Sequence, residues 1–309
     1  MKTLEAIFTK LDVQSLAYVG SRVPAGSSIE FEISHLSASH RVAADQTITM
    51  AHVTALRDSF VLLEYRSYQA MRCDRGVPDD QTVARKSILE DFQRWFQLFW
   101  LVLDTIFPEG NEPKPQYDQI SKQCRLLHIR YLIMTMRLAN QGPSREIVFD
   151  TFEDSFAEII RHAEALLGAS PPRLLFTMDM ELIEPLYFAA MKCREPTKRA
   201  RALNLLNSCT QEGIWDGPLM AAIARYAVCL EEALFETEFP SSQLHSTKDE
   251  YSSSVADRMW NHRRAVNAET CRVSSLALLS VDWKHRTAFV ECGHAGGKVR
   301  TMCTAATLP

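Results

Sequence analysis

The stretch that decides the fold runs from residue 176 to residue 232 and reads FTMDMELIEPLYFAAMKCREPTKRARALNLLNSCTQEGIWDGPLMAAIARYAVCLEE. Pro196 suits the first turn of a helix, where its missing backbone N–H costs nothing. Asp216 is placed to cap the next helix, because an aspartate accepts a hydrogen bond from a free amide of the first turn. Apolar residues then recur at helical spacing, at Leu219, Ile223, Tyr226, Leu230 and Ala233. The stretch therefore predicts consecutive helices.

Three more apolar stripes, whose members are mostly three or four residues apart, lie upstream of residue 176. Residues at these spacings share one face of a helix, so each stripe predicts a long helix with a buried side. Apolar residues also flank the first stripe, which predicts a helix covered on several sides. The stripes are Ile88, Phe92, Trp95, Phe99, Leu103 and Ile106; Ile120, Cys124, Leu127, Tyr131, Met134 and Leu138; and Phe149, Phe152, Phe156, Ile159, Ala163 and Leu166.

Turn-forming residues separate the predicted helices and mark the longer connections. Gly142-Pro143-Ser144 and Ser170-Pro171-Pro172 each lie between two helices, because glycine and proline interrupt helical backbone. Residues 20–44 predict a long irregular connection, and residues 238–254 predict an exposed loop. A last short helix is expected at residues 255–264.

The pattern changes after residue 269, where two short apolar segments flank the turn Asp282-Trp283-Lys284-His285 and predict a β-hairpin. A hairpin of this size is not stable alone, so we expect it to dock on the helices. The predicted fold class is all-α, a multi-helix bundle with a small C-terminal β-hairpin. Its parts are a helical regulatory-type domain over residues 1–268, the hairpin over residues 269–292, and a Gly-, Ala- and Thr-rich disordered tail over residues 293–309.

Composition excludes several classes of protein. The 309 residues include 46% hydrophobic and 23% charged residues, which is typical of a globular chain rather than a disordered or fibrous one. The formal net charge is −4 and no long run of Lys and Arg occurs, so direct nucleic-acid binding is not expected. The most apolar run, residues 95–107, is about half of the roughly 20 residues that span a bilayer. We therefore expect no membrane-spanning segment.

The eight cysteines are widely spaced, with the smallest separation between Cys292 and Cys303, so no CxxC pair is present. Mostly buried, reduced thiols are the expected state, which is typical of a reducing compartment. The start of the chain, MKTLEAIFTKLD, lacks the apolar segment of a secretory signal. The expected location is the nucleus or the cytoplasm.

Residues 176–232 closely resemble the fungal-specific transcription factor domain, the regulatory region of fungal zinc-cluster transcription factors. Weaker similarity covers Leu11-Asp12-Val13-Gln14 and the hairpin segment VSSLALLSVDWKHRTAFVEC at residues 273–292. The residues that carry the central match are Ile183, Pro185 to Phe188, Lys192-Cys193-Arg194, Pro196, Arg199, Ala202, Leu205, Leu206, Glu212, Gly213, Trp215 and Asp216. These motif residues are interpreted as architectural: Pro185 starts or kinks a helix, Trp215 is an apolar anchor and Asp216 is a cap.

Relatives in this family usually carry a zinc cluster at the N-terminus, in which six closely spaced cysteines hold two metal ions and place a helix in the DNA major groove. The present sequence departs from that pattern, because Met1 lies close to the Leu11–Gln14 motif and its cysteines are too far apart. Either an upstream module was cut away or the chain is a stand-alone member without a DNA reader.

Four groups of residues are candidate chemical sites, and each group also has a structural interpretation. Cysteines and a histidine near the C-terminus are candidate zinc ligands or incidental thiols, and three carboxylates are a candidate acid–base group or charges at a helix N-terminus. His128 is a candidate buried proton-transfer group or a hydrogen-bonded core histidine. A basic cluster is a candidate nuclear import signal or a solvated helix face. The candidate zinc ligands are Cys271, Cys292, His294 and Cys303; the three carboxylates are Asp179, Glu181 and Glu184; and the basic cluster is Lys198, Arg199 and Arg201.

Two hypotheses for the function follow. The first is a regulatory or interaction domain that binds a protein partner or a small apolar effector, with homodimerisation left open. The alternative is a stand-alone, cofactor-independent enzyme of the cyclase or pericyclase type in a fungal natural-product pathway, because a helical core rich in aromatic residues can enclose an apolar substrate. No phosphate loop, nucleophile elbow or HExxH motif occurs, so no cofactor, metal or catalytic residue is assigned.

Overall fold

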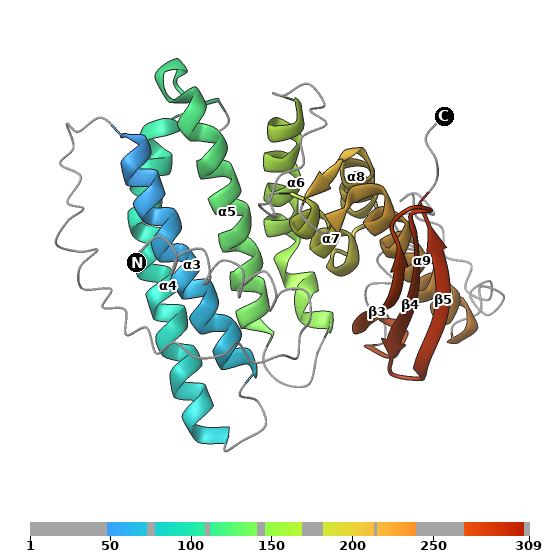
Figure 1. Cartoon of the computed structure of the whole chain (residues 1–309). Coiled ribbons are helices and arrows are strands. Elements are labelled where there is room, and N and C mark those ends of the chain that lie inside the picture. The colour runs from blue at the N-terminus through green and yellow to red at the C-terminus, as the bar shows by residue number, and fades with distance from the viewer. Residues whose placement is uncertain are drawn as a thin grey trace, which may run out of the picture. The chain divides into compact units, whose positions relative to one another are not determined.

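The computed structural model (Figure 1) describes residues 48–72, 78–108, 112–140, 146–168, 182–212, 215–238 and 269–305. These residues form seven α-helices, one pair of very short antiparallel strands and a three-stranded antiparallel sheet. They divide into two compact units, unit 1 up to Ala139 and unit 2 from Asn140 onward. The mostly helical fold class with a small C-terminal sheet is confirmed, while the predicted helical domain of residues 1–268 extends over both units.

Unit 1 contains three long helices that pack against one another: α3 (Met50–Arg72), α4 (Pro78–Ile106) and α5 (Asp118–Ala139), the last preceded by the short 3-10 helix η1 (Pro115–Tyr117). The two predicted stripes of α4 and α5 face its core. The indole Nε1 of Trp95 donates to the carbonyl oxygen of Leu56 at 3.1 Å and to Oγ of Ser59 at 3.0 Å. Because this buried polar atom has partners, the large aromatic side chain fits the apolar interior without an unpaired donor.

Unit 2 contains the helices α6 (Glu153–Gly168), α7 (Ile183–Lys192), α8 (Pro196–Ser208) and α9 (Gly217–Glu238). The third predicted stripe begins in the 3-10 helix η2 (Glu146–Phe152) and continues into α6. Helices α7, α8 and α9 pack against each other, and α6 packs on α7 and α8. The strands β1 (Gln211–Glu212) and β2 (Trp215–Asp216) pair between α8 and α9.

Acidic side chains cap three helix starts in unit 2. Asp216 accepts a hydrogen bond from Leu219 N at 2.9 Å, which confirms its predicted role at the start of α9. Glu195, just before Pro196, accepts from Thr197 N at 3.0 Å and from Lys198 N at 2.6 Å. Glu212 reaches from β1 to α7 and accepts from Leu182 N at 3.0 Å and from Ile183 N at 2.9 Å. The Glu and Asp of the 212–216 motif therefore hold two different helix ends.

The C-terminal sheet consists of β3 (Ser275–Asp282), β4 (Thr287–His294) and β5 (Gly297–Thr304), in the order β3-β4-β5. The hairpin of β3 and β4 is confirmed, and the short 3-10 helix η4 (Glu269–Cys271) precedes it. The inner face of the sheet packs on α9 through β4 and β5, with Ala288, Val290, Cys292 and Cys303 buried. This packing supplies the support that an isolated hairpin lacks.

The prediction of a disordered tail is wrong for residues 293–304. After the two-residue connection Ala295-Gly296, β5 pairs with β4 along its whole length, from His294↔Gly297 to Thr287↔Thr304. Gly297 adopts a φ of 135°, which a glycine tolerates at a tight turn because it has no Cβ. Gly296 and Gly297, which indicated a loose tail, thus belong to the turn between two strands, and Gly293 lies within β4.

Several predicted features lie outside the described residues: the Leu11–Gln14 motif, the connection at residues 20–44, the two helix-separating turns at residues 142–144 and 170–172, nearly all of the loop at residues 238–254, and the short helix at residues 255–264. Among the helices that the structure does describe, none combines the length and hydropathy needed to cross a lipid bilayer.

The cap at α9 provides a test of this fold. Replacing Asp216 by Ala removes the acceptor for Leu219 N and the ion pair to Arg286 Nε at 2.9 Å. We expect the free energy of unfolding to fall by about 1–2 kcal/mol, measured by urea denaturation with far-UV circular dichroism. Asp216→Asn keeps an oxygen that accepts the amide hydrogen bond and should lose less. Equal losses for the two variants would contradict the capping role.

Candidate functional site

The connection between α7 and α8 places a run of charged residues inside unit 2. Lys192 ends α7 and its Nζ lies 2.7 Å from Glu146 Oε1, while Arg194 in the connection lies 3.3 Å from Glu146 Oε2 through Nη2. Arg194 Nη1 also donates to the carbonyl oxygen of Lys192 at 2.6 Å. The Lys-Cys-Arg motif at residues 192–194 is thus tied to η2, which supplies Glu146.

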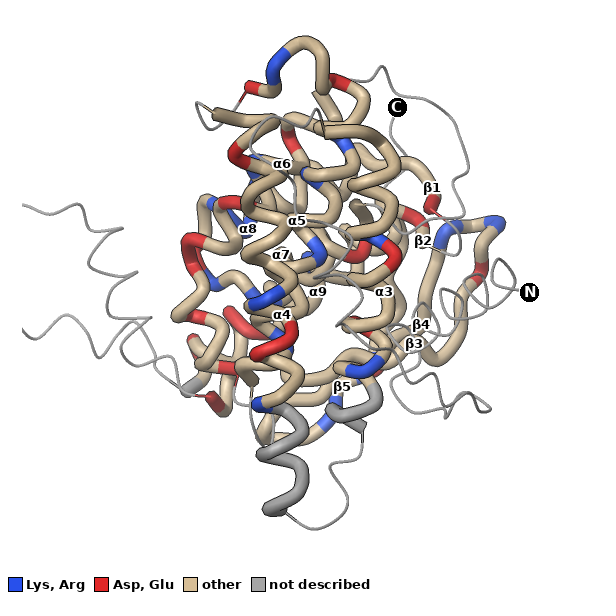
Figure 2. Tube along the Cα trace, turned by 90° about the vertical axis from the view of Figure 1, so that its left-hand side faces the viewer, with Lys and Arg blue, Asp and Glu red and all other residues tan. Residues whose placement is uncertain are grey.

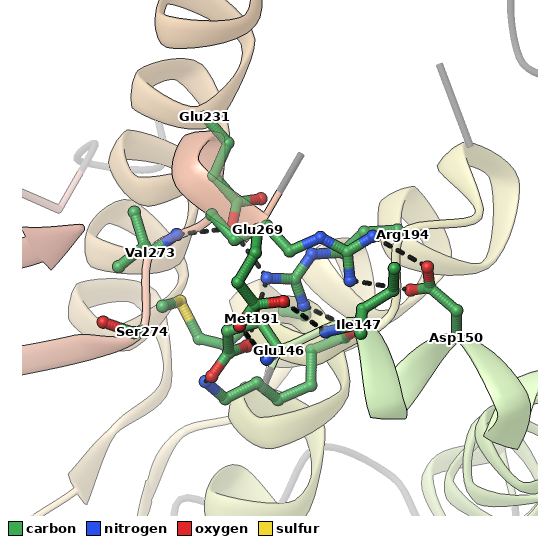
Figure 3. A network of polar contacts seen from close by, with 12 residues as sticks. Glu146, Ile147, Asp150, Met191, Arg194, Glu231, Glu269, Val273 and Ser274 are labelled. Carbon is green, nitrogen blue, oxygen red and sulfur yellow. Dashed lines mark hydrogen bonds and ion pairs between the residues drawn. The ribbon is translucent and has the colours of Figure 1, made fainter. Parts of the chain in front are cut away.

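Glu231 of α9 is the centre of these contacts. Its Oε1 accepts from Arg194 Nη2 at 2.8 Å and from the backbone amide of Val273 at 2.9 Å, and its Oε2 accepts from Arg199 Nη2 at 2.6 Å. Arg199 Nε donates in addition to the carbonyl oxygen of Ala190 at 3.0 Å. Figure 3 shows Glu231, Arg194 and Val273 converging from three separate segments of the chain.

The segment that leads into the sheet joins the same network. Glu269 accepts from the backbone amides of Glu146 and Ile147, the latter at 2.9 Å, and so covers the free N–H groups of η2 (Figure 3). Arg272 is only 1% exposed and binds Asp150 with two parallel hydrogen bonds of 3.0 and 2.7 Å. Such a two-pronged arginine–carboxylate pair is geometrically specific. The complete set, called here the buried ion-pair network, is Glu146, Asp150, Lys192, Arg194, Arg199, Glu231, Glu269 and Arg272.

The network is balanced, with four acidic and four basic side chains. Burial alone would raise the pKa of Glu231, but the guanidinium groups of Arg194 and Arg199 lower it below its ordinary value. Burial lowers the pKa of Lys192, and the carboxylate of Glu146 offsets part of that effect. Removing charges from water is costly, so each charge depends on its partners being present.

The network is engaged in structure rather than poised for catalysis. A general base needs an oxygen that faces its substrate, whereas both oxygens of Glu231 and both of Glu146 already accept hydrogen bonds from the protein. A cavity of about 20 Å³ lies beside Arg194, which is space for a water molecule but not for a metabolite. It is lined by Phe149, Asp150, Glu153, Phe156, Cys193, Arg194 and Glu195.

The proposed basic cluster does not form a shared surface. Arg199 is buried in the network, Lys198 Nζ pairs with Glu153 of α6 at 2.6 Å, and Arg201 binds both oxygens of Glu164 of α6. The interpretation of all three as a solvated helix face is therefore wrong for Arg199, because its charge has a buried carboxylate partner. The contacts of Lys198 and Arg201 join α8 to α6.

The candidate zinc ligands do not assemble. Cys292 and Cys303 lie on the inner face of the sheet, Cys271 is buried in η4, and His294 ends β4. Within the described part of the chain, no three of these four residues bring their ligand atoms together. Burial raises the pKa of the Cys292 thiol to about 11, so this side chain is held as an uncharged thiol.

The remaining candidates have different outcomes. His128 on α5 is half-buried among aromatic rings, with centroids 5.9 Å from Phe96 and 6.2 Å from Phe99. Glu184 lies in the first turn of α7, where a negative charge is favourable, in agreement with the helix-terminus interpretation. Asp179 and Glu181 lie outside the described residues.

The outer face of the C-terminal sheet carries an apolar row across all three strands. Phe289 on β4 is paired with Met302 on β5 and with Ser280 on β3, and the irregularity between Leu278 and Ser280 leaves Leu279 beside them. Exposure is 44% for Leu279, 37% for Phe289 and 68% for Met302. We call these three residues the outer-face row. Large apolar residues that are exposed together on a sheet are typical of binding surfaces.

Charges of both signs are interspersed along the described helices, without a basic stripe of the kind that nucleic acid requires (Figure 2). Comparison of the chain with protein-family models, with curated proteins and with solved structures gave no match. The resemblance of residues 176–232 to a fungal regulatory domain therefore stays a prediction.

The network predicts a large and pH-dependent stability loss in Glu231→Gln. The substitution leaves Arg194 and Arg199 buried without their carboxylate, so we expect the free energy of unfolding at pH 7 to fall by about 3–5 kcal/mol in urea denaturation. The exposed neighbour Glu232 provides the matched control. Glu232→Gln should change the free energy of unfolding by less than about 0.5 kcal/mol.

The pH dependence follows from the lowered pKa of Glu231. Its stabilising contribution is present above the ordinary pKa of 4.5 and is lost as the pH falls through the lowered value in the folded state. The difference between wild type and Glu231→Gln should therefore narrow in acid. A difference that stays constant from neutral to acidic pH would rule out the charged pair as its cause.

Proposed function

We propose that this chain is a regulatory or interaction domain that acts by binding a partner protein. The observation that carries the proposal is the outer-face row of Leu279, Phe289 and Met302. An antiparallel sheet that packs on helices with one face usually turns polar residues outward on the other. Apolar side chains across the middle of the outer face are unfavourable in water and become favourable when a partner covers them.

The interior of unit 2 supports a binding role over a catalytic one. The residues that resemble the fungal regulatory family are used inside the fold: Arg194 and Arg199 bind Glu231, while Glu212 and Asp216 cap helices. A domain built to present a surface needs this rigidity and needs no reactive group. The proposed function agrees with the regulatory role that the resemblance implies.

The enzyme alternative would require the aromatic residues to enclose a substrate. In the described part of unit 1 the rings pack on one another instead. Phe96 stacks on Tyr131 with 4.1 Å between ring centroids, and Trp95 stacks on Phe99 with 4.9 Å. The first contact joins α4 to α5 and the second lies within α4, and both favour a structural role for the rings.

A reporter assay distinguishes the two functions. The chain is fused to an unrelated sequence-specific DNA-binding domain in a fungal reporter strain, and transcription is compared with that given by the DNA-binding domain alone. An interaction domain that recruits a partner changes reporter output, whereas an enzyme that acts on a diffusing substrate leaves it unchanged. The fusion that carries the exposed change Glu232→Gln is the control, and it should give the same reporter output as the wild-type fusion. Unchanged output for the wild-type fusion at equal protein level would contradict the proposal.

A further inference from the structure

The outer face of the sheet is arranged in rows whose chemistry differs. The register places Ala277, Glu291 and Arg300 in the row next to the outer-face row, and Ser275, Gly293 and Lys298 in the row beyond it. On the opposite side lie Asp282, Thr287 and Thr304. The outer-face row is therefore bordered on one side by Glu291, Lys298 and Arg300, called here the charged patch. On the other side it is bordered by mostly small polar residues.

The charged patch has a surplus of positive charge. Glu291 accepts from Lys298 Nζ through Oε1 and from Arg300 Nε through Oε2, each at 2.7 Å, so two cations share one carboxylate. Both cationic side chains are well exposed, 68% for Lys298 and 64% for Arg300, while that of Glu291 is 11% exposed. A partner that approaches this face meets the two cations before it meets the carboxylate.

From this arrangement we infer that the outer face binds an acidic amphipathic segment of a partner protein. The apolar side chains of the segment cover Phe289 and Met302, and its carboxylates pair with Lys298 and Arg300. This inference rests on the proposed interaction function and names the chemistry of the partner. Complementary charge sets the orientation of the segment, and burial of the apolar row supplies most of the affinity.

Two other occupants fit the face less well. A lipid surface would receive the apolar row, but insertion would also desolvate Glu291 and Arg300, which lie together in the neighbouring row. A second copy of the same face would bring two more exposed cations and a carboxylate that is already paired with both, so the two facing patches would carry net charge of the same sign, and like charges repel. An acidic segment avoids both costs.

Peptide binding by the intact chain tests the inference. The probes are a fluorescent synthetic peptide with Leu and Phe on one helical face and Glu on the other, and its twin with Lys in place of every Glu. Binding is measured by fluorescence anisotropy. The acidic peptide should bind the wild type more tightly than the basic twin, and its affinity should weaken with added salt.

Two double variants and one single control variant locate the surface that contacts the peptide. Phe289→Thr with Met302→Thr keeps residues that favour strands and should weaken acidic-peptide binding by about tenfold or more. Lys298→Gln with Arg300→Gln should remove the discrimination between the two peptides. Lys86→Glu, an exposed charge change on α4 of unit 1, is the control and should leave both affinities unchanged. Circular dichroism verifies that each variant is folded.

The opposite results would overturn the inference. These are equal binding of the two peptides by the wild type, or acidic-peptide binding that survives Phe289→Thr with Met302→Thr. Binding of phosphatidylserine-containing vesicles in place of the peptide would assign the face to a membrane. A dimer in analytical ultracentrifugation that the same double variant dissociates would assign it to a second copy.

The reporter assay separates failure of this inference from failure of the proposed function. If the fusion with Phe289→Thr and Met302→Thr keeps the full reporter response, the chain recruits its partner elsewhere and only the inference fails. If the wild-type fusion gives no response, the proposed function fails.

Discussion

Unit 2 depends on one buried carboxylate, that of Glu231. It binds Arg194 of the connection between α7 and α8, Arg199 of α8, and the backbone amide of Val273 just before the sheet. Because two guanidinium groups and an amide meet at one acidic side chain, α9 fixes the positions of α8 and of the C-terminal sheet at the same time. The sheet can then present its outer face as a rigid surface.

Much of the helical fold follows from the spacing of apolar residues. The stripes of α4, α5 and α9 are regular over several turns, and Pro196 and Asp216 mark helix starts through local chemistry. Helix α3 has a comparable buried stripe, formed by Val53, Leu56, Phe60 and Leu63. Local periodicity is sufficient to predict such helices, because helical geometry sets the sequence spacing of the apolar residues that share one face.

Long-range partners could not be predicted in the same way. Glu231 lies 32 residues from Arg199 and 42 from Val273, and Arg272 lies 122 residues from Asp150. One feature of the sequence does point to the buried network. Lys192 and Arg194 directly follow the apolar run at residues 186–191, and basic side chains in such a position are expected to have buried acidic partners. The strand β5 was missed because the glycines before it indicate a loop, although its alternating residues pair with β4. The outer-face row depends on cross-strand register, which the sequence of one strand does not contain.

The interior of unit 2 maintains the fold, and the outer face of the C-terminal sheet is the surface to which we assign the proposed function. This assignment predicts that Met302, on the edge strand β5, lies against a partner protein when the chain is at work. Site-specific photo-crosslinking in cells tests this directly, with a photoreactive amino acid placed at position 302 and, as control, at position 86 on α4. We predict a cross-link from position 302 to an acidic segment of another protein, and none to that segment from position 86. The same products from both positions, or cross-links from position 302 only within the chain, would contradict the account.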